Sequence, residues 1–327
     1  MSNIMDTIIP FDTIVLSGGG TKGLYTLGSL HYYYEQKKYV PSKVETYVGT
    51  SAGSAISLLL VCNYLPMEIF HALYLMESFF DVRHDNISFL DVIKNVFKNM
   101  GLLPIDSLIL KIEKLIIAKL GEVPTLERLY EVTKKEFVCV VTNVTKRKVE
   151  YFNHKNHPNL KCTDAVKMSC NIPLMFQKIR YNNCYYVDGA MLNNFAIDYA
   201  DKKTNKILGI YLPNNDLPSD EGFGGYLSHI ILAMQDEMYR VRLRNVGDNV
   251  TIIVIYGEKN DGMMEVNIAS NKKMRMFLGG IKAAKIKDTA EYIRVEGWES
   301  IQPTSAKFKF EINDWDNSWN DKWDDVW

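Results

Sequence analysis

The sequence has few cysteines, and none of them form a recognisable pair. The five cysteines are odd in number and include no Cys-x-x-Cys motif, which argues against a zinc site and against a disulfide framework. A charge excess is also missing, since 38 basic residues stand against 39 acidic ones. The formal charge of −1 gives no global attraction to nucleic acid. We therefore expect a protein with reduced, buried thiols that needs neither a metal nor a cofactor and binds no nucleic acid.

Long apolar runs are missing as well. The nearest candidate for a spanning helix, Ala52 to Met67, is shorter than the ~20 residues that a bilayer requires, and it contains Asn63 and Pro66. The amino terminus has neither the basic region nor the apolar region of a secretory signal. These features predict an intracellular, cytoplasmic protein whose contact with membranes, if any, is peripheral.

The chain does have ample apolar residues for a core, at 47% of its length, arranged in alternating strand-like and helix-like segments. The uninterrupted apolar run from Phe137 to Val141 is typical of a strand that is covered on both faces of a parallel sheet. We predict a doubly wound α/β fold with a mainly parallel central sheet flanked by helices. The predicted strands are Thr13–Leu16, Thr46–Val48, Glu136–Thr145, Cys184–Val187, Lys206–Leu212 and Val250–Tyr256, and the predicted helices are Lys22–Tyr34, Ala52–Tyr64 and Tyr226–Arg244.

Between Pro66 and Pro124 the pattern changes to helices without intervening strands, at 67–80, 89–100 and 105–120. We interpret residues from about 66 to 125 as a helical cap inserted into the α/β domain. In the last of these helices, Lys111, Lys114 and Lys119 accompany an apolar stripe. This pattern predicts either contact with lipid headgroups or ordinary packing against the core.

Two glycine-rich motifs carry the chemistry. Gly49-Thr50-Ser51-Ala52-Gly53 follows a predicted strand and precedes a predicted helix, the context in which a Gly-x-Ser-x-Gly turn presents a nucleophilic serine. Ser51 comes after only one βα unit, whereas several strands precede the nucleophile of an α/β-hydrolase. The position therefore argues against an ordinary Ser–His–Asp triad. The earlier run, Ser17 to Gly23, supplies backbone N–H donors.

Taken together, these motifs resemble those of the patatin-like phospholipases. The glycine run with Lys22, the Ser51 pentapeptide, the segment Met168–Phe176 and Asp188-Gly189-Ala190 occur in the order of that family and span about residues 14–194. The resemblance implies a three-layer α/β fold and a lipid acyl hydrolase, with Ser51 as nucleophile and Asp188 as its base. Two positions depart from the family: Ala190 stands where a second glycine is usual, and Ser17 where an acidic residue is frequent.

The glycine run admits more than one function. The N–H groups of Gly18, Gly19 and Gly20 are the predicted oxyanion hole, helped by the positive end of the following helix. Lys22 is a candidate for binding a substrate phosphate, or it caps the loop. The same glycines loosely match a dinucleotide-binding pattern, but only Glu45 stands near the position of the acidic partner that such a site needs.

Two alternatives to a Ser–Asp lipid hydrolase remain from the sequence. A serine esterase with a triad requires a histidine after the acid, and His229 is the residue that satisfies this order. It lies on a predicted amphipathic helix, where a packed or surface histidine is the commoner case. The other alternative is a catalytically silent scaffold that binds a protein partner.

The scaffold alternative rests on the carboxyl-terminal tail. Four of the five tryptophans, Trp315, Trp319, Trp323 and Trp327, lie four residues apart among five aspartates. On a helix this spacing would align them on one face, as a binding surface for a protein partner. Packing against the domain or disorder of the tail are the other interpretations. We predict a catalytic domain at residues 1–312 and an acidic tail at residues 313–327.

Overall fold

The structure is a computed structural model, and it describes residues 10–78, 101–103, 105–213, 222–258, 261, 265 and 267–289. The chain divides into two units, Met1–Thr289 and Ala290–Trp327. The second unit lies outside the described residues, so the tryptophan tail and its boundary at 312/313 stay predictions. The predicted helix at 89–100 also lies outside them.

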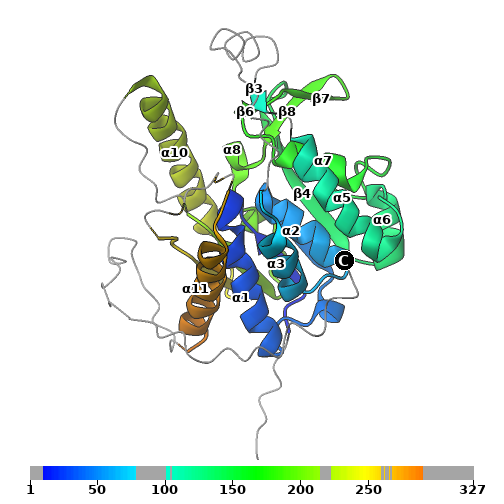
Figure 1. The fold of residues 1–327 in the computed structure, drawn as a ribbon, viewed down its shortest axis with the longest axis vertical. Helices are drawn as coiled ribbons and strands as arrows, with labels where there is room; N and C mark the ends of the chain where they lie inside the picture. The colour runs from blue at the N-terminus through cyan, green and yellow to red at the C-terminus, as the bar shows by residue number, and fades with distance from the viewer. Residues whose placement is uncertain are drawn as a thin grey trace, which may run out of the picture. The chain divides into compact units, whose positions relative to one another are not determined.

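The first unit is built on one mixed sheet whose strand order is β10-β9-β1-β2-β4-β8-β7 (Figure 1). The five strands from β10 to β4 are parallel, as predicted, and β5, β8 and β7 add antiparallel pairs beyond them. The strands are β1 Thr13–Leu16, β2 Thr46–Thr50, β4 Glu136–Asn143, β5 Lys148–Phe152, β7 Ile179–Tyr181, β8 Cys184–Asp188, β9 Ile207–Tyr211 and β10 Val250–Val254.

Helices cover both faces of this sheet, so the expected three-layer arrangement is present (Figure 1). The helices are α1 Gly23–Glu35, α2 Ala52–Val61, α3 Pro66–Leu75, α5 Asp106–Leu120, α6 Leu126–Thr133, α7 Cys162–Ser169, α8 Ala190–Asn193, α9 Ile197–Ala200, α10 Gly222–Leu243 and α11 Ser270–Thr289. Among the described helices, none is both long enough and apolar enough to cross a bilayer.

The first unit has two hydrophobic cores, one on each face of the sheet, because alternate side chains of a strand point to opposite faces. Ile14 and Leu16 of β1 pack into the larger core with α1, α2 and α11, whereas Val15 between them packs into the smaller core on the other face. In β4, Phe137, Cys139 and Val141 face the larger core, and the valines between them face the smaller one. Because both faces are buried, the strand needs no polar residues, which is why it appears in the sequence as one apolar run.

The region from 66 to 125 differs from the prediction in one respect. It is not purely helical, because β3 (Gly101–Leu103) pairs in parallel with β6 (Leu174–Phe176) in a separate two-stranded sheet. A strand of three residues is too short to give a period-two signal, and its pairing partner lies some seventy positions away. The helices α3 and α5 occupy two of the three predicted segments.

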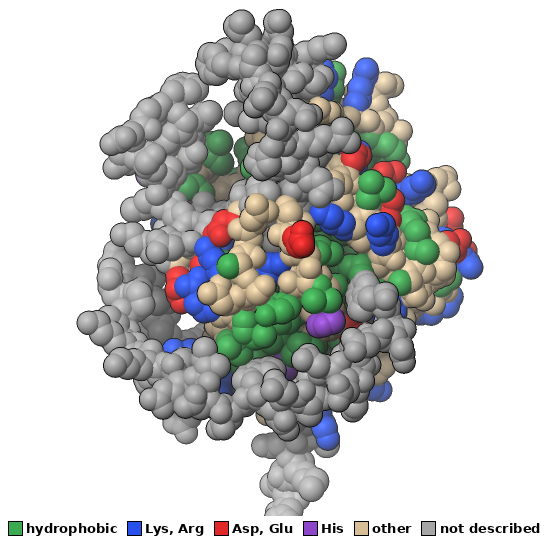
Figure 2. Space-filling view, viewed as in Figure 1, with side chains coloured by type: hydrophobic (Ala, Val, Ile, Leu, Met, Phe, Trp, Pro, Cys, Tyr) green, Lys and Arg blue, Asp and Glu red, His purple; other side chains and the backbone are tan. Residues whose placement is uncertain are grey.

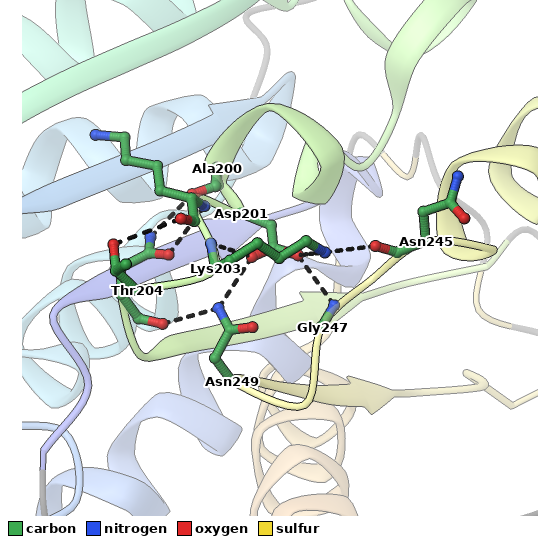
Figure 3. Close-up of polar contacts among 9 residues, drawn as sticks. Ala200, Asp201, Lys203, Thr204, Asn245, Gly247 and Asn249 are labelled. Atoms are coloured by element: carbon green, nitrogen blue, oxygen red, sulfur yellow. Dashed lines mark hydrogen bonds and ion pairs between the residues drawn. The ribbon is translucent and has the colours of Figure 1, made fainter.

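A polar cluster lies at the end of the sheet where β9 and β10 begin (Figure 3). Asp201 accepts hydrogen bonds from the Gly247 N–H at 3.0 Å, the Asn249 amide at 2.9 Å and the Lys203 ammonium group at 2.6 Å. Burial by itself would raise the pKa of Asp201, but these hydrogen bonds outweigh it and hold the pKa below its ordinary value. The cluster joins the loops that precede β9 and β10, far along the strands from their carboxyl ends.

Candidate active site

Ser51 occupies a sharp turn between β2 and α2, as the pentapeptide predicts. Its backbone lies at φ 51° and ψ −128°, a left-handed conformation that is rare for any residue other than glycine. The flanking glycines are required by close contacts. A Cβ atom on Gly53 would lie 2.5 Å from the carbonyl oxygens of Leu16 and Ser17, and one on Gly49 would lie 2.4 Å from the carbonyl oxygen of Gly53. The turn therefore presses α2 against the end of β1.

Strand register brings Asp188 to this serine. Strand β4 pairs with β2 up to Thr50↔Val140 and then with β8 from Val141↔Asp188 onward. Both partners lie on the same edge of β4, because β5 occupies the opposite edge along Cys139–Asn143. Strands β2 and β8 thus meet end to end, and the residue after Thr50 faces the last residue of β8.

The result is a direct hydrogen bond between two residues 137 positions apart. The Ser51 hydroxyl donates to Asp188 Oδ2 at 2.6 Å, and the other carboxylate oxygen accepts the Ala190 N–H at 2.8 Å. Gly189 is needed here, because a Cβ atom would lie 2.2 Å from the carbonyl oxygen of Val140. Ala190 contributes its backbone N–H to this contact, a group that alanine and glycine both supply.

Asp188 is 3% exposed, and this burial raises its pKa to about 6. The hydrogen bonds from Ser51 and Ala190 act in the opposite direction, because they stabilise the charged carboxylate. A carboxyl group with a pKa near 6 holds a proton more readily than an exposed aspartate does, and it is still ionised at neutral pH. It can therefore accept a proton and return it.

Two residues of the segment Met168–Phe176 fix this pair in place, a role that the sequence did not reveal. The Ser169 hydroxyl accepts the Ser51 N–H at 2.8 Å and donates to the Val140 carbonyl oxygen at 2.6 Å. The Asn171 carbonyl oxygen accepts the Asp188 N–H at 2.8 Å. The only sequence signal for these residues was their place in a block that resembles the family.

The three glycines of the predicted oxyanion hole differ in their surroundings. A Cβ atom on Gly18 would lie 2.9 Å from the Ser51 Cβ, so the turn passes directly against the serine. The Gly18 N–H donates to the Asn194 side-chain oxygen at 2.9 Å, and Asn194 was not anticipated from the sequence. Gly20, with φ 56°, begins a 3₁₀ turn and lines the cavity next to Ser51. Gly19 precedes that turn, where the first N–H groups have no partner inside the helix.

Lys22 lies apart from the reacting groups. Its side chain is 2% exposed, and its Cδ lies 3.6 Å from where a Cβ on Gly257 would stand. It is not among the residues that line the cavity. These contacts favour a structural role over phosphate binding, although the phosphate hypothesis stays a prediction.

An apolar cavity of about 120 Å³ opens at Ser51. Its wall is formed by α1, α2, α3, α5 and the segment at 170–176, with side chains that include Leu24, Ile56, Leu59, Leu73, Ile112 and Phe176. Lys111 is the one charged residue of this wall among the described residues, and its ammonium group donates to the Ser78 carbonyl oxygen at 2.8 Å. Such a lining suits a hydrocarbon chain.

The residues that line the cavity also show which face of α5 packs inward. Ile112, Leu115 and Ile116 of its apolar stripe are buried, and the first two line the cavity. Ile117 is exposed, and Lys119 forms an ion pair with Glu68 at 2.9 Å. The stripe thus packs inward, which favours the core interpretation, and lipid contact through α5 stays an untested prediction.

Comparison with known proteins agrees with this geometry. The family model described as patatin-like phospholipase matches residues 14–201, which is more than half of the chain and includes both Ser51 and Asp188. The chain belongs to the patatin-like phospholipase family.

Relatives of this family member come from viruses and bacteria. "Probable lipid hydrolase 463L" of invertebrate iridescent virus 6 is 32% identical over 204 residues, which is 60% of this chain. The match spans 65% of that relative's length. The uncharacterized protein YqhO of Bacillus subtilis is 28% identical over 214 residues, or 61% of this chain and 70% of the relative. The crystal structure of VipD from Legionella pneumophila shares the fold, with a TM-score of 0.53, 17% identity, and coverage of 86% of this chain and 67% of that one.

Ser17, the second position at which this sequence departs from the family pattern, forms hydrogen bonds within and beyond the glycine turn. Its hydroxyl donates to the Gly18 carbonyl oxygen at 3.0 Å and accepts the Leu212 N–H at 2.9 Å. Ser17 therefore ties the turn to the end of β9 without a charge.

His229, the histidine that a Ser–His–Asp triad would require, lies on α10 and does not line the cavity. In a triad the acid hydrogen-bonds to the histidine, and the histidine bonds to the serine. Here both Asp188 oxygens already accept hydrogen bonds, from Ser51 and from Ala190. His154 stacks on Tyr130, and His157 packs against Phe152 at a tilted angle. Among the described residues, no group of three His, Cys, Asp or Glu is placed to hold a metal ion.

Proposed function

We propose that this protein is a lipid acyl hydrolase of the phospholipase A type, which cleaves fatty-acyl esters through an acyl-Ser51 intermediate with Asp188 as the base. The observation that carries this proposal is the 2.6 Å hydrogen bond from Ser51 to Asp188 at the wall of an apolar cavity. Family membership and the name of the viral relative support the lipid substrate.

In the first half-reaction, Ser51 Oγ attacks the carbonyl carbon of the ester while its proton passes to Asp188 Oδ2. The tetrahedral intermediate then breaks its bond to the alkoxy oxygen, which takes the proton from Asp188. The products of this step are a free alcohol, such as a lysolipid, and an ester between Ser51 and the fatty acid.

In the second half-reaction, water attacks the acyl-Ser51 carbonyl and gives a proton to Asp188. The bond to Ser51 Oγ then breaks, the serine regains a proton from Asp188, and the fatty acid leaves. Asp188 acts as base and acid in each half, which suits a carboxyl group whose pKa is raised toward neutrality by burial.

The negative charge on the carbonyl oxygen needs N–H donors, and the glycine turn beside Ser51 is the proposed source. The N–H groups of Gly19 and Gly20 stand at the start of a helical turn, next to α1, whose amino end adds positive potential. Gly18 would join them only if its N–H exchanged the Asn194 oxygen for the substrate oxygen. The acyl chain would occupy the apolar cavity, and the head group would remain outside it.

The proposal is tested with the full chain by fluorophosphonate labelling and by fatty-acid release from phosphatidylcholine vesicles. We expect one label on Ser51, found by peptide mass spectrometry, and fatty acid in the products. The label forms because the deprotonated serine attacks phosphorus as it would attack a carbonyl carbon. Folded protein that neither accepts the label nor releases fatty acid would overturn the proposal and favour the scaffold.

The pH dependence of the reaction tests the role of Asp188 separately. The base must be ionised, so kcat/KM should rise with pH through about 6 and level off above it, in line with the pKa of the buried carboxyl. Hydrolysis of a water-soluble ester whose own charge does not change between pH 4 and pH 8 provides the measurement. A profile already flat at pH 4 would contradict the assignment.

A further inference from the structure

Basic residues are concentrated on two neighbouring segments at the end of the sheet that carries Ser51. Val144 to Lys148, which join β4 to β5, are all exposed, and so are Lys178 and Arg180 at β7. We call Lys146, Arg147, Lys148, Lys178 and Arg180 the cationic hairpin surface. Figure 2 shows basic side chains protruding at the end of the molecule where Figure 1 places β7 and β8.

Backbone contacts hold the two turns together. The Val144 N–H donates to the Tyr185 carbonyl oxygen at 3.0 Å, and the Tyr185 N–H donates to the Thr145 hydroxyl at 2.9 Å. Strands β7 and β8 pair at Arg180↔Tyr185. The five basic residues therefore lie on segments that hydrogen bonds through β8 connect.

The charge of this surface is local and largely unneutralised. The five basic residues of this surface belong to a chain whose formal charge is −1. Within the part of the chain that the structure describes, Lys146, Arg147, Lys178 and Arg180 form no ion pair, and Lys148 approaches Glu150 at 3.4 Å. An anionic partner would provide the missing counter-charge.

Apolar groups lie among these charges, and a separate apolar stripe lies on α10. Val144 and Tyr185 are 48% and 42% exposed, and the Arg180 guanidinium lies 5.8 Å from the centre of the Tyr185 ring. On α10, Tyr226, Ile230 and Met234 are exposed at a spacing of four residues, and residues 222–235 include no Asp, Glu, Lys or Arg. Figure 1 shows α10 beginning at the same end of the sheet as β7.

We propose that the cationic hairpin surface, with the exposed stripe of α10, docks this enzyme on an anionic lipid bilayer. The inference rests on the proposed function, because a lipid hydrolase must meet its substrate at a bilayer. Basic residues attract anionic headgroups, whereas tyrosine and aliphatic side chains enter the interface. Apolar residues at this spacing would contribute nothing to binding a nucleic acid backbone, so the lipid surface is the occupant that accounts for both features.

This surface lies near Ser51 and Asp188, so docking through it would bring the active site to the bilayer. Tyr185, which pairs with Arg180 of this surface, lies three residues before the proposed base Asp188 on the same short strand, β8. Docking through β7, β8 and the β4–β5 turn would hold the carboxyl ends of the central strands, where Ser51 lies, toward the bilayer. An ester could then reach Ser51 without leaving the interface for bulk water.

The test measures sedimentation of the full chain with sucrose-loaded vesicles, in a Ser51→Ala background so that no hydrolysis alters the lipid. The docking variant combines Lys146→Glu, Arg147→Glu, Lys178→Glu and Arg180→Glu. The matched control makes the same charge change at the opposite end of the sheet, with Lys43, Lys202, Lys285 and Lys287 replaced by Glu; all four are exposed. Melting by circular dichroism verifies that each variant is folded.

For phosphatidylcholine vesicles containing phosphatidylserine, we expect the docking variant to lose on the order of 1000-fold in partition coefficient and the control variant about twofold. Binding of the parent should weaken with added salt. Replacing Tyr226, Ile230 and Met234 by serine should remove the binding that survives high salt. Equal losses in the two charge variants, or parent binding that is no stronger to anionic than to neutral vesicles, would overturn the proposal.

The result separates this inference from the proposed function. Strong, patch-dependent binding of the Ser51→Ala protein, together with wild-type protein that releases no fatty acid, would keep the docking surface and reject the hydrolase. Fatty-acid release by wild type with no effect of the docking variant on binding would do the reverse.

Discussion

Replacing Ser51 with alanine is expected to lower kcat for fatty-acid release by a factor on the order of 10⁶, the loss seen when a serine hydrolase loses its nucleophile. The reason is that Ser51 is the hydroxyl bonded to Asp188, and among the residues that the structure describes no second hydroxyl donates to that carboxylate. The fold should survive, because the backbone N–H of Ser51, which bonds to Ser169, is retained. Fatty-acid release from vesicles and fluorophosphonate labelling both report the loss.

Ser57→Ala is the matched control for this variant. Ser57 lies on the same helix, α2, and is fully buried, but its hydroxyl has no hydrogen-bond partner among the described residues. Removing an unsatisfied hydroxyl costs little stability, so we expect activity and melting temperature close to those of the wild type. Ser51→Ala protein that still takes up one label per chain would show that the nucleophile lies elsewhere.

Asp188→Asn is expected to have the second largest effect, a loss of kcat on the order of 10⁴. The amide has nearly the shape of the carboxylate, but it cannot accept the serine proton, so the geometry remains while the base is lost. His229→Ala is the matched control, since the dyad gives His229 no part in the reaction. If His229→Ala were the severe variant and Asp188→Asn mild, the triad would replace the dyad.

The same variant should also change stability with a defined sign. The pKa of Asp188 is raised from 3.8 to about 6 in the folded protein, so the native state holds this proton more tightly than the unfolded chain does. The associated stability is complete below pH 4 and is lost as the pH rises through about 6. The loss amounts to about 3 kcal/mol, and asparagine does not undergo it.

Urea unfolding at pH 4 and pH 8 measures this effect as a difference between the two proteins. Relative to the wild type, Asp188→Asn should gain about 2 kcal/mol of unfolding free energy between pH 4 and pH 8, because pH 4 already lies just above the ordinary pKa of 3.8. A gain in stability accompanied by a loss of activity is the trade-off expected of a buried catalytic charge. A relative stability that does not change with pH would show that burial does not raise the pKa of Asp188.

Much of the fold could be predicted from the sequence, because the relevant signals are local. The apolar run from Phe137 to Val141 predicted a strand covered on both faces, and β4 has that environment. The Ser51 pentapeptide predicted a turn between a strand and a helix, and the positive φ of Ser51 is the conformation that such a turn requires. The strand β3 was missed because three residues carry no periodicity.

The same difference between local and non-local signals applies to the active site. Glycines at positions 49 and 53, between a predicted strand and a predicted helix, pointed to Ser51, because a sharp turn of this kind needs small residues around its serine. The sequence also carries the charge of the hairpin turns, but it does not place those turns beside one another. Asp188 could be assigned only through the family, since its distance along the chain says nothing about its distance in space.

The sequence by itself therefore determined the α/β alternation, the turn at Ser51 and the family to which the chain belongs. The tertiary structure alone decided that β2 and β8 meet end to end on one edge of β4, with Thr50 opposite Val140 and Asp188 opposite Val141. The physical reason is that strand pairing is a non-local choice. It depends on which backbone edges remain free once the core is packed, and that junction sets the hydrogen bond between Ser51 and Asp188.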